Sequence, residues 1–384
     1  MNFEFATATR IVFGPGSSAQ VASEARSMGS RALIITGGTP ERVAPIFDTI
    51  TAAGVSAVPF TVVREPDVAD IEEGRTMLRE EGCDLVIGIG GGSVMDAAKA
   101  IAATGANPGN LIDYLEVVGK GKPLQHPSLP CIVLPTTAGT GAEVTRNAVI
   151  TSPEHKVKVS LRSPFLLPRL VVVDPELTLP LPPEITAATG LDALTQCIEA
   201  YVSVKAQPLT DGFCVEGITR AARSLYRACT HGNDLAARED MAAASLMSGM
   251  ALANAGLGAV HGFASPIGGI CGIPHGAVCA LLLPAVMEMN VSVLQKEQPD
   301  SAALGRYTTV ARLCTGNPDA AATDGVHWIK NLCATLPLPS ASHFGLAQDQ
   351  FSGIAAAAAK ASSMKGNPVV LSNVELLRIL EDTF

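Results

Sequence analysis

Short apolar runs rich in valine and isoleucine recur through the first half of the chain, and each ends at glycine, proline or threonine. Continuous runs of this length are typical of strands buried on both faces of a parallel sheet. Helix-permissive stretches at 43–54, 71–82 and 95–105 lie between several of them, and this alternation predicts an open α/β sheet. The predicted strands lie in RIVFG at 10–14, RALIITGG at 31–38, SAVPFTVV at 56–63, DLVIGIGGG at 84–92, PCIVLPTT at 130–137 and LVVVDP at 170–175.

The chain changes character at LTLPLPPE, residues 177–184, where three prolines stand close together. The sequence beyond this point is rich in alanine and in long helix-permissive stretches, with few β-branched runs. A chain of 384 residues is long for one core and comfortable for two. We therefore expect an α/β dinucleotide-binding domain at 1–181 and a mostly helical domain at 182–384.

Composition and charge exclude several classes of partner. Hydrophobic residues make up 47% of the chain and charged residues 16%, which is typical of a globular protein with a large interior. The formal net charge of −9, without a local cluster of Lys and Arg, disfavours nucleic acid and anionic membranes as partners. We identify no basic leader and no stretch approaching about 20 apolar residues, so a cytoplasmic location is expected.

The nine cysteines occur singly, without C-x-x-C spacing. Scattered cysteines of this kind are typical of reduced core thiols in a reducing compartment. A cysteine-based metal site or a disulfide framework is the less favoured interpretation.

A glycine-rich turn, GIGGGSVMDAAKA at 88–100, follows one predicted strand and opens a predicted helix. Glycines let a phosphate approach the backbone closely, and the first turn of a helix offers unpaired N–H groups. The turn lacks the G-x-G-x-x-G spacing, so phosphate binding and a simple packing role are equally compatible with it. Lys99 falls on the new helix, where a solvated lysine is the simplest interpretation.

A second polar turn, PTTAGTGAEVTRNAVI at 135–150, follows the next predicted strand. It clusters the hydroxyls of Thr136, Thr137 and Thr140 at the carboxyl end of a strand, where open sheets bind ligands. An ordinary hydroxyl-capped turn is the alternative. Two such turns at the same sheet edge favour a ligand site.

Four polar residues of the second half form a candidate metal cage. Asp192 and Gln196 are four residues apart in a helix-permissive segment, so their side chains project from one helical face. His261 and His275 stand in the later stretch VHGFASPIGGICGIPHG at 260–276. Histidines that are simply satisfied within a core are the alternative interpretation.

These stretches, with GPGS at 14–17, VVDPELT at 172–178 and KGNPVVL at 365–371, resemble the iron-containing, or group III, alcohol dehydrogenases over nearly the whole chain. The resemblance implies an N-terminal dinucleotide-binding domain, an all-helical C-terminal domain and an active site in the cleft between them. It also implies hydride transfer between an alcohol or aldehyde carbon and NAD(P), assisted by Fe(II) or Zn(II). Because family members commonly form dimers or larger assemblies, we expect a homo-oligomer.

The resemblance assigns roles residue by residue. Contacts to the cofactor pyrophosphate are implied for Gly91, Gly92 and Ser93, with Asp96 and Lys99 at the matching helix start. The nicotinamide and phosphate side would be lined by Thr136, Thr137, Thr140, Asn147 and Lys158. Three of the family's four metal ligands, one Asp and three His, are matched by Asp192, His261 and His275.

Two positions depart from the family pattern. Gln196 stands where the family has a histidine ligand, and a neutral amide oxygen is a harder and generally weaker ligand for Fe(II) or Zn(II). Ser265 stands where a further active-site histidine is usual. Because serine does not exchange a proton near neutral pH, a proton relay at this place must use water or the substrate.

The choice between NAD and NADP depends on the residue after the second predicted strand. Family members selective for NAD carry an Asp there, which binds the ribose 2′-hydroxyl. This chain has Gly37 followed by Gly38, with Arg42 nearby. Nothing acidic repels a 2′-phosphate, so NADP is expected to be tolerated or preferred.

Other functions share parts of this pattern. A maleylacetate reductase-like enzyme, a dehydroquinate-synthase-like lyase and a vestigial, non-catalytic nucleotide-binding protein are the alternatives. For the dehydrogenase, a small alcohol or aldehyde is the expected substrate. Four apolar residues would line the substrate cleft, and core packing is the alternative role for them. They are Phe263, Ile267, Cys271 and Ile273.

Overall fold

The computed structural model describes residues 2–155, 157–271 and 273–384, apart from the side chains of Cys271 and His343. The described chain divides into two compact units, and the chain crosses from one unit to the other after residues 6, 137, 140 and 178. The α/β unit comprises residues 7–137 and 141–178. The helical unit comprises residues 1–6, 138–140 and 179–384.

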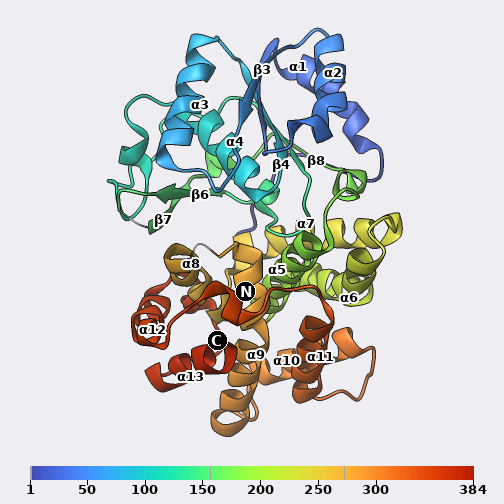
Figure 1. Cartoon of the computed structure of the whole chain (residues 1–384), viewed down its shortest axis with the longest axis vertical. Coiled ribbons are helices and arrows are strands. Elements are labelled where there is room, and N and C mark those ends of the chain that lie inside the picture. Colours follow the sequence, from blue (N-terminus) through green and yellow to red (C-terminus); the bar gives the residue numbers. More distant parts are fainter. Residues whose placement is uncertain (1, 156, 272) are drawn as a thin grey trace. The chain divides into compact units, whose positions relative to one another are not determined.

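A six-stranded parallel sheet forms the centre of the α/β unit, in the order β1-β8-β5-β4-β2-β3 (Figure 1). Every residue of β4, β5 and β8, three of the four interior strands, is buried, as expected for strands covered on both faces. All of the predicted strand runs are confirmed. The strands are β1 (Ile11–Phe13), β2 (Arg31–Thr36), β3 (Ser56–Thr61), β4 (Leu85–Gly90), β5 (Cys131–Pro135) and β8 (Leu170–Val173).

Helices cover both faces of this sheet. Successive parallel strands are joined by crossover connections, and these connections are usually helices. The first two, α1 (Val21–Met28) and α2 (Ala44–Ala52), pack on one face, where Ile34, Ile87 and Ile132 meet them. On the other side α3 (Val68–Glu80) packs against α4 (Gly92–Gly105). Figure 1 shows the two pairs on opposite sides of the sheet.

A two-stranded antiparallel hairpin between β5 and β8 is absent from the sequence-based prediction. It consists of β6 (Asn147–Ser152) and β7 (Val157–Arg162), paired from Asn147 with Arg162 to Ser152 with Val157. Both strands alternate between more and less buried residues, which is the pattern of a ribbon covered on one face. Because β6 lies against α4, the hairpin extends the surface around the first turn of that helix.

The helical unit is organised around α5 (Pro183–Val202), which packs against α6, α7 and α9. A methyl group at Gly190 would lie 2.3 Å from Leu225 of α6, so the absence of a side chain lets these two helices approach closely. The other helices are α6 (Pro208–Thr230), α7 (Leu235–Ala255), α8 (Ala259–Cys271), α9 (His275–Glu297), α10 (Ala302–Thr315), α11 (Ala322–Thr335), α12 (Phe351–Lys360) and α13 (Asn373–Thr383).

Two short segments from the first half of the sequence pack with the helices. The amide group of Asn254 pairs with both backbone groups of Ala6, at 2.8 and 2.9 Å. In the segment 138–140, a methyl group at Gly139 would lie 2.7 Å from the Cβ of Thr189, so this segment lies directly on α5. These contacts explain why residues distant in sequence belong to the helical unit.

The expectation that no stretch could span a membrane needs a correction. The helix α9 has 23 residues and is long and apolar enough to pass such a test. However, 67% of the most apolar 18-residue stretch of α9 is buried inside the protein, as in the core helix of a globular protein.

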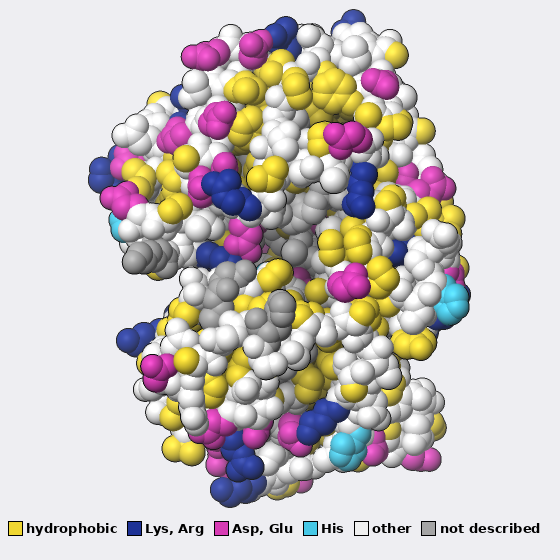
Figure 2. All heavy atoms as spheres, viewed as in Figure 1, with side chains coloured by type: hydrophobic (Ala, Val, Ile, Leu, Met, Phe, Trp, Pro, Cys, Tyr) yellow, Lys and Arg dark blue, Asp and Glu magenta, His cyan; other side chains and the backbone are white. Residues whose placement is uncertain are grey.

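Charged side chains of both signs are scattered over the face that Figure 2 shows. Figure 2 shows Lys and Arg interspersed with Asp and Glu on the visible face, without a continuous basic area among the coloured residues.

Candidate functional site

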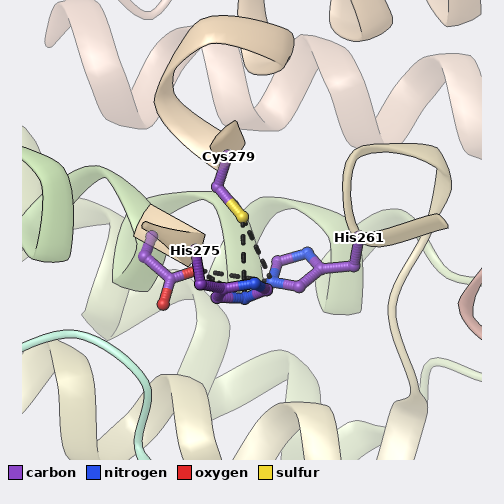
Figure 3. Close-up of side chains that lie close together, drawn as sticks. His261, His275 and Cys279 are labelled. Atoms are coloured by element: carbon purple, nitrogen blue, oxygen red, sulfur yellow. Dashed lines mark hydrogen bonds and ion pairs between the residues drawn. The ribbon is translucent and has the colours of Figure 1, made fainter. Parts of the chain in front are cut away.

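Four side chains from three helices of the helical unit converge on one point. They are Asp192 of α5, His261 of α8, and His275 and Cys279 of α9, and their ligand atoms all lie within 4.8 Å of one another. Figure 3 shows the Cys279 sulfur directed at the two imidazole rings. The sequence-based prediction therefore placed three of these residues correctly together and omitted Cys279.

Asp192 is the anionic centre of this cluster. Its side chain is 1% exposed, and neither carboxylate oxygen accepts a hydrogen bond that satisfies geometric criteria from any described group. Oδ1 lies 3.3 Å from Nε2 of His261 and 3.7 Å from Nε2 of His275. Burial alone would raise the pKa of Asp192, but the charges of His275 and His261 hold this pKa below its ordinary value. In the metal-free protein the protonated imidazoles supply the positive charge that this buried carboxylate needs.

Glu199, one helical turn after Gln196, orients His261. Its Oε2 lies 2.6 Å from Nδ1 of the ring, and its Oε1 accepts a hydrogen bond of 2.7 Å from the backbone N–H of Val260. A carboxylate on one ring nitrogen fixes the tautomer and presents the lone pair of the other nitrogen. Nε2 of His261 therefore faces Asp192, and it would be a metal-ligand atom once its proton is displaced.

The start of α8 is anchored by Asn367, in the late KGNPVVL stretch. Its amide oxygen accepts from the backbone N–H of Ala259 at 3.2 Å, and its amide group exchanges hydrogen bonds with Asn290 at 2.9 and 3.1 Å. A methyl group at Gly258 would lie 2.9 Å from both Asn367 and Glu199, so only glycine fits there. These contacts hold the backbone that carries His261.

His275 is the first residue of α9, and its side chain is 37% exposed. The negative charge at Cys279, followed by that of Asp192, raises the pKa of His275 to about 9. The site is thus buried on the Asp192 side and accessible on the His275 side. This asymmetry is what a site open to a ligand requires.

Gln196 lies on the same helix as Asp192 and is also buried. Its Oε1 accepts a hydrogen bond of 2.7 Å from the hydroxyl of Ser248 on α7. The amide oxygen thus has a partner within the protein. The role of Gln196 as a metal ligand stays a prediction.

The remaining predicted residues of this unit lie in different environments. Ser265 of α8 is exposed, and its tentative catalytic role stays a prediction. Phe263, Ile267 and Ile273 belong to the hydrophobic core, so the packing interpretation applies to them. The side chain of Cys271 lies outside the described residues.

The predicted cofactor turns lie at the carboxyl edge of the sheet. Gly37 follows β2, and Gly91, Gly92 and Ser93 follow the adjacent strand β4. From β2 the chain moves outward to β3, then returns past β2 to β4, so the strand order reverses between β2 and β4. Open α/β sheets bind nucleotides at such a reversal.

The first turn of α4 fits a phosphate. Gly91 is its N-cap and no described side chain caps it, so its first N–H groups are available to a ligand. A methyl group at Gly91 would lie 3.4 Å from Thr137, at the end of the next strand. The donor set of this turn therefore fits the pyrophosphate of NAD(P), although the roles of the individual residues stay predictions.

Lys99 is buried and paired, which corrects the interpretation of a solvated lysine. Its ammonium lies 3.0 Å from Oδ1 of Asp96 and donates to the backbone oxygens of Ala142, at 2.7 Å, and Asn147. Asp96 also accepts from the N–H of Val149 at 3.1 Å. Burial raises the pKa of Asp96, against the charge of Lys99. In this structure Asp96 and Lys99 join α4 to the hairpin.

The other predicted cofactor residues are distributed along the polar turn and the hairpin. Thr136 continues the sheet by donating its N–H to Gly90 at 2.8 Å, and Thr137 follows it. Thr140 belongs to the short segment that packs with the helical unit. Lys158 of β7 pairs with Glu65 at 2.6 Å. Their contacts to a cofactor stay predictions, as does that of Asn147.

Two functional residues were missed from the sequence, and one of them had a signal. Cys279 follows His275 by four residues on a predicted helix, which is the same spacing that linked Asp192 to Gln196. This spacing was overlooked because Cys279 was interpreted as one of several scattered core cysteines. Glu199 had no such signal, because its partner His261 lies on a distant helix.

Comparisons with known proteins agree with this geometry. The family model "iron-containing alcohol dehydrogenase" matches residues 8–175, and the C-terminal model of the same family matches residues 186–384. A choline dehydrogenase of Bacillus subtilis is 35% identical over 95% of this chain and 90% of its own length. A 1,3-propanediol dehydrogenase of Citrobacter freundii is 34% identical over 97% and 96%.

Solved structures share the whole fold. A crystal structure of a 1,3-propanediol oxidoreductase covers 100% of both chains with a TM-score of 0.92 and 32% identity. The alcohol dehydrogenase of Oenococcus oeni also covers 100% of both chains, with a TM-score of 0.92 and 31% identity.

Proposed function

Because the chain belongs to the iron-containing alcohol dehydrogenase family, it is an oxidoreductase that interconverts alcohols with aldehydes or ketones, and we propose how it does so. The hydride passes between the substrate carbon and C4 of a nicotinamide. Asp192, His261 and His275 hold the divalent ion that the family implies, Fe(II) or Zn(II).

One observation carries this proposal. The two buried oxygens of Asp192 have no hydrogen-bond partner among the described groups and lie beside Nε2 of two histidines. A bound divalent ion would supply Lewis acidity, lowering the pKa of a substrate hydroxyl or polarising a carbonyl. Two imidazoles and a carboxylate are a common donor set for Zn(II) and Fe(II).

The chain's own residues supply positioning. Glu199 holds the imidazole of His261 in one tautomer, and the uncapped first turn of α4 receives the cofactor pyrophosphate. Ser265, in the place of a family histidine, cannot act as a base near neutral pH. The proton of the substrate hydroxyl therefore leaves through water rather than through this side chain.

For the cofactor, we propose that NADP is accepted and preferred. Gly37 at the end of β2 offers no carboxylate to a ribose 2′-hydroxyl, and Gly38 follows it. Arg42, in the short helix η2 (Pro40–Val43), brings a positive charge close in sequence. A strong kinetic preference for NAD over NADP would contradict this proposal.

The substrate is a small alcohol or aldehyde, in agreement with the alcohols named for the similar proteins of Bacillus subtilis and Citrobacter freundii. We further propose a cytoplasmic homo-oligomer. The assembly is proposed because members of this family commonly form dimers or larger assemblies, and the location because they are generally soluble enzymes.

The decisive experiment combines metal analysis with a substrate screen. The protein is purified without added metal, its metal content is measured, and alcohols and aldehydes are assayed with both nicotinamides. About one ion per chain and alcohol-dependent reduction of NADP are expected. Turnover of maleylacetate or of an acidic lyase substrate would favour a related enzyme, and cofactor binding without turnover would favour a vestigial protein.

A further inference from the structure

Building on the metal site of the proposed function, we propose that the Cys279 thiolate is the fourth protein ligand of the ion. The site is then an Asp–His–His–Cys site formed by Asp192, His261, His275 and Cys279. This differs from the expectation that Gln196 takes the fourth position.

The position of Cys279 supports this assignment. It lies one turn after His275 on α9, so both side chains project from the same helical face. The sulfur is 3.7 Å from Nε2 of His275 and 3.8 Å from Nε2 of His261, and the residue is fully buried. Figure 3 shows the sulfur and both rings facing a common point.

The separations between the ligand atoms agree with tetrahedral coordination. Bonds of about 2.3 Å to sulfur and about 2.0 Å to nitrogen or oxygen give edges of about 3.5 Å between S and N, and about 3.3 Å between O and N. The two S–N separations of 3.7 and 3.8 Å and the Asp192–His261 separation of 3.3 Å are close to these values. The Asp192–His275 separation of 3.7 Å is slightly longer.

The chemistry of the cluster also requires a cation. Glu199 occupies Nδ1 of His261, so the second ring nitrogen brings a lone pair towards the carboxylate of Asp192. A lone pair, a carboxylate oxygen and a sulfur repel one another unless protons or a metal ion lie between them. Protons lie there in the metal-free protein, and a bound ion would take their place beside the Asp192 oxygens, which have no hydrogen-bond partner among the described groups.

Gln196 is a weaker competitor for this position. Its amide oxygen accepts a hydrogen bond from Ser248 at 2.7 Å, whereas the Cys279 sulfur has both histidine nitrogens as its neighbours. A thiolate is also a softer and more strongly bound ligand for Zn(II), Co(II) or Fe(II) than a neutral amide.

The thiolate changes the charge of the site. Asp192 and Cys279 together carry two negative charges and neutralise a divalent ion, whereas Asp192 with Gln196 would leave one positive charge. We therefore expect tight retention of thiophilic ions such as Zn(II) and weak binding of Mg(II) or Mn(II), which prefer oxygen ligands.

The test uses the full-length protein reconstituted with Co(II) after removal of its metal. Thiolate ligation gives a sulfur-to-cobalt charge-transfer band in the near ultraviolet. The band is expected in the wild type, in Gln196→Ala and in Cys314→Ser, which replaces another buried helical thiol, and is expected to vanish in Cys279→Ser. Circular dichroism verifies that each variant is folded.

Affinity provides a second readout, by competition with a chromophoric chelator. Cys279→Ser is expected to bind Zn(II) about 100-fold more weakly or worse, since even the loss of an outer partner costs about 10- to 100-fold. If this variant does not fold, X-ray absorption of the Zn(II)-loaded wild type decides the question. One sulfur at about 2.3 Å is expected.

The outcomes separate this assignment from the metal site itself. Stoichiometric Co(II) binding without the charge-transfer band, or a band that persists in Cys279→Ser, would overturn the role of Cys279 and leave the metal site in place. A wild-type protein that binds no Co(II) or Zn(II) would overturn both.

Discussion

Oε2 of Glu199 lies 2.6 Å from Nδ1 of His261, on the side of the ring opposite to Asp192. The two carboxylates thus flank one imidazole, with one in contact with each ring nitrogen. Only the outer one, Glu199, also binds the backbone, through Val260. We therefore expect Glu199 to position His261, and Asp192 to be one of the proposed ligands.

Replacing Glu199 with glutamine should weaken the metal site without abolishing it. The single amide oxygen can accept from Nδ1 of His261 or from the N–H of Val260 but not from both, and the side chain loses the charge that makes Nε2 a better donor. About a 10- to 100-fold loss of Zn(II) affinity is expected. A chelator competition titration measures this loss. Glu288→Gln, at an exposed pair with Lys330, is the matched control. Unchanged Zn(II) affinity in Glu199→Gln would exclude the positioning role.

Metal affinity should increase with pH up to about 9. The pKa of His275 is raised to about 9 in the metal-free protein, first by the negative charge at Cys279, so a bound ion must displace a proton below that pH. The apparent Zn(II) affinity is therefore expected to rise between pH 6.5 and about 9 and then to level off. Isothermal titration in buffers of different ionisation enthalpy counts the released protons, and an affinity independent of pH would contradict the protonated His275.

Loss of the His275 proton should lower the stability of the metal-free protein, although it raises the affinity for the metal. Because the folded-state pKa of His275 lies above its ordinary value of 6.5, its contribution is complete below pH 6.5 and is lost as the pH rises through about 9. The melting temperature of the metal-free protein is expected to fall over this range. His275→Gln, which cannot be charged, should show a smaller fall.

Glu143 should reduce the stability of the α/β unit at neutral pH. It lies in the short helix η4 (Ala142–Val144), where burial raises its pKa from 4.5 to about 7. Between pH 4.5 and about 7, Glu143 is therefore protonated in the folded state and ionised in the unfolded chain. The free energy of unfolding falls over this range as the pH rises, by at most roughly 3 kcal/mol.

Glu143→Gln removes this titration and serves as the comparison. The variant is expected to melt at a higher temperature than the wild type above pH 7, and at a similar temperature below pH 4.5. Thermal unfolding across this range measures both. Parallel pH profiles of the two proteins would show that Glu143 is already ionised in the folded state.

Two adjacent glycines should respond differently to alanine. A methyl group at Gly91 would lie 3.4 Å from Thr137, an ordinary contact, so Gly91→Ala is expected to fold and to obstruct only the approach of the pyrophosphate. We expect the KM for the nicotinamide to rise about tenfold or more, equivalent to about 1.4 kcal/mol of binding. Steady-state kinetics with each nicotinamide measures this change.

Gly90→Ala is the structural counterpart. Its methyl group would lie 2.5 Å from Val94, so overpacking is expected to destabilise the protein by about 1–3 kcal/mol. Thermal unfolding distinguishes the two variants. If Gly91→Ala loses stability but keeps its KM, the phosphate role of this turn is wrong.

Patterns along the chain were sufficient for the fold. Buried parallel strands must be apolar at every position, so runs such as LVVV at 170–173 are visible without knowledge of their neighbours. The hairpin of β6 and β7 escaped prediction because its strands are half-exposed and mix polar with apolar residues, so they form no continuous apolar run. The spacing of His275 and Cys279, by contrast, is local, and a cysteine four residues after a candidate ligand could have been weighed from the sequence.

Contacts between distant helices needed the folded chain. Asp192, His261 and the pair His275 and Cys279 lie on three helices, and no local pattern states that their ligand atoms meet within 4.8 Å. Likewise, the burial of Lys99 depends on backbone oxygens at Ala142 and Asn147. Periodicity reports which face of an element is apolar, but the packing of one helix on another decides which polar atoms share a site. For this protein, that packing brings the Cys279 sulfur close to the side chains of Asp192, His261 and His275.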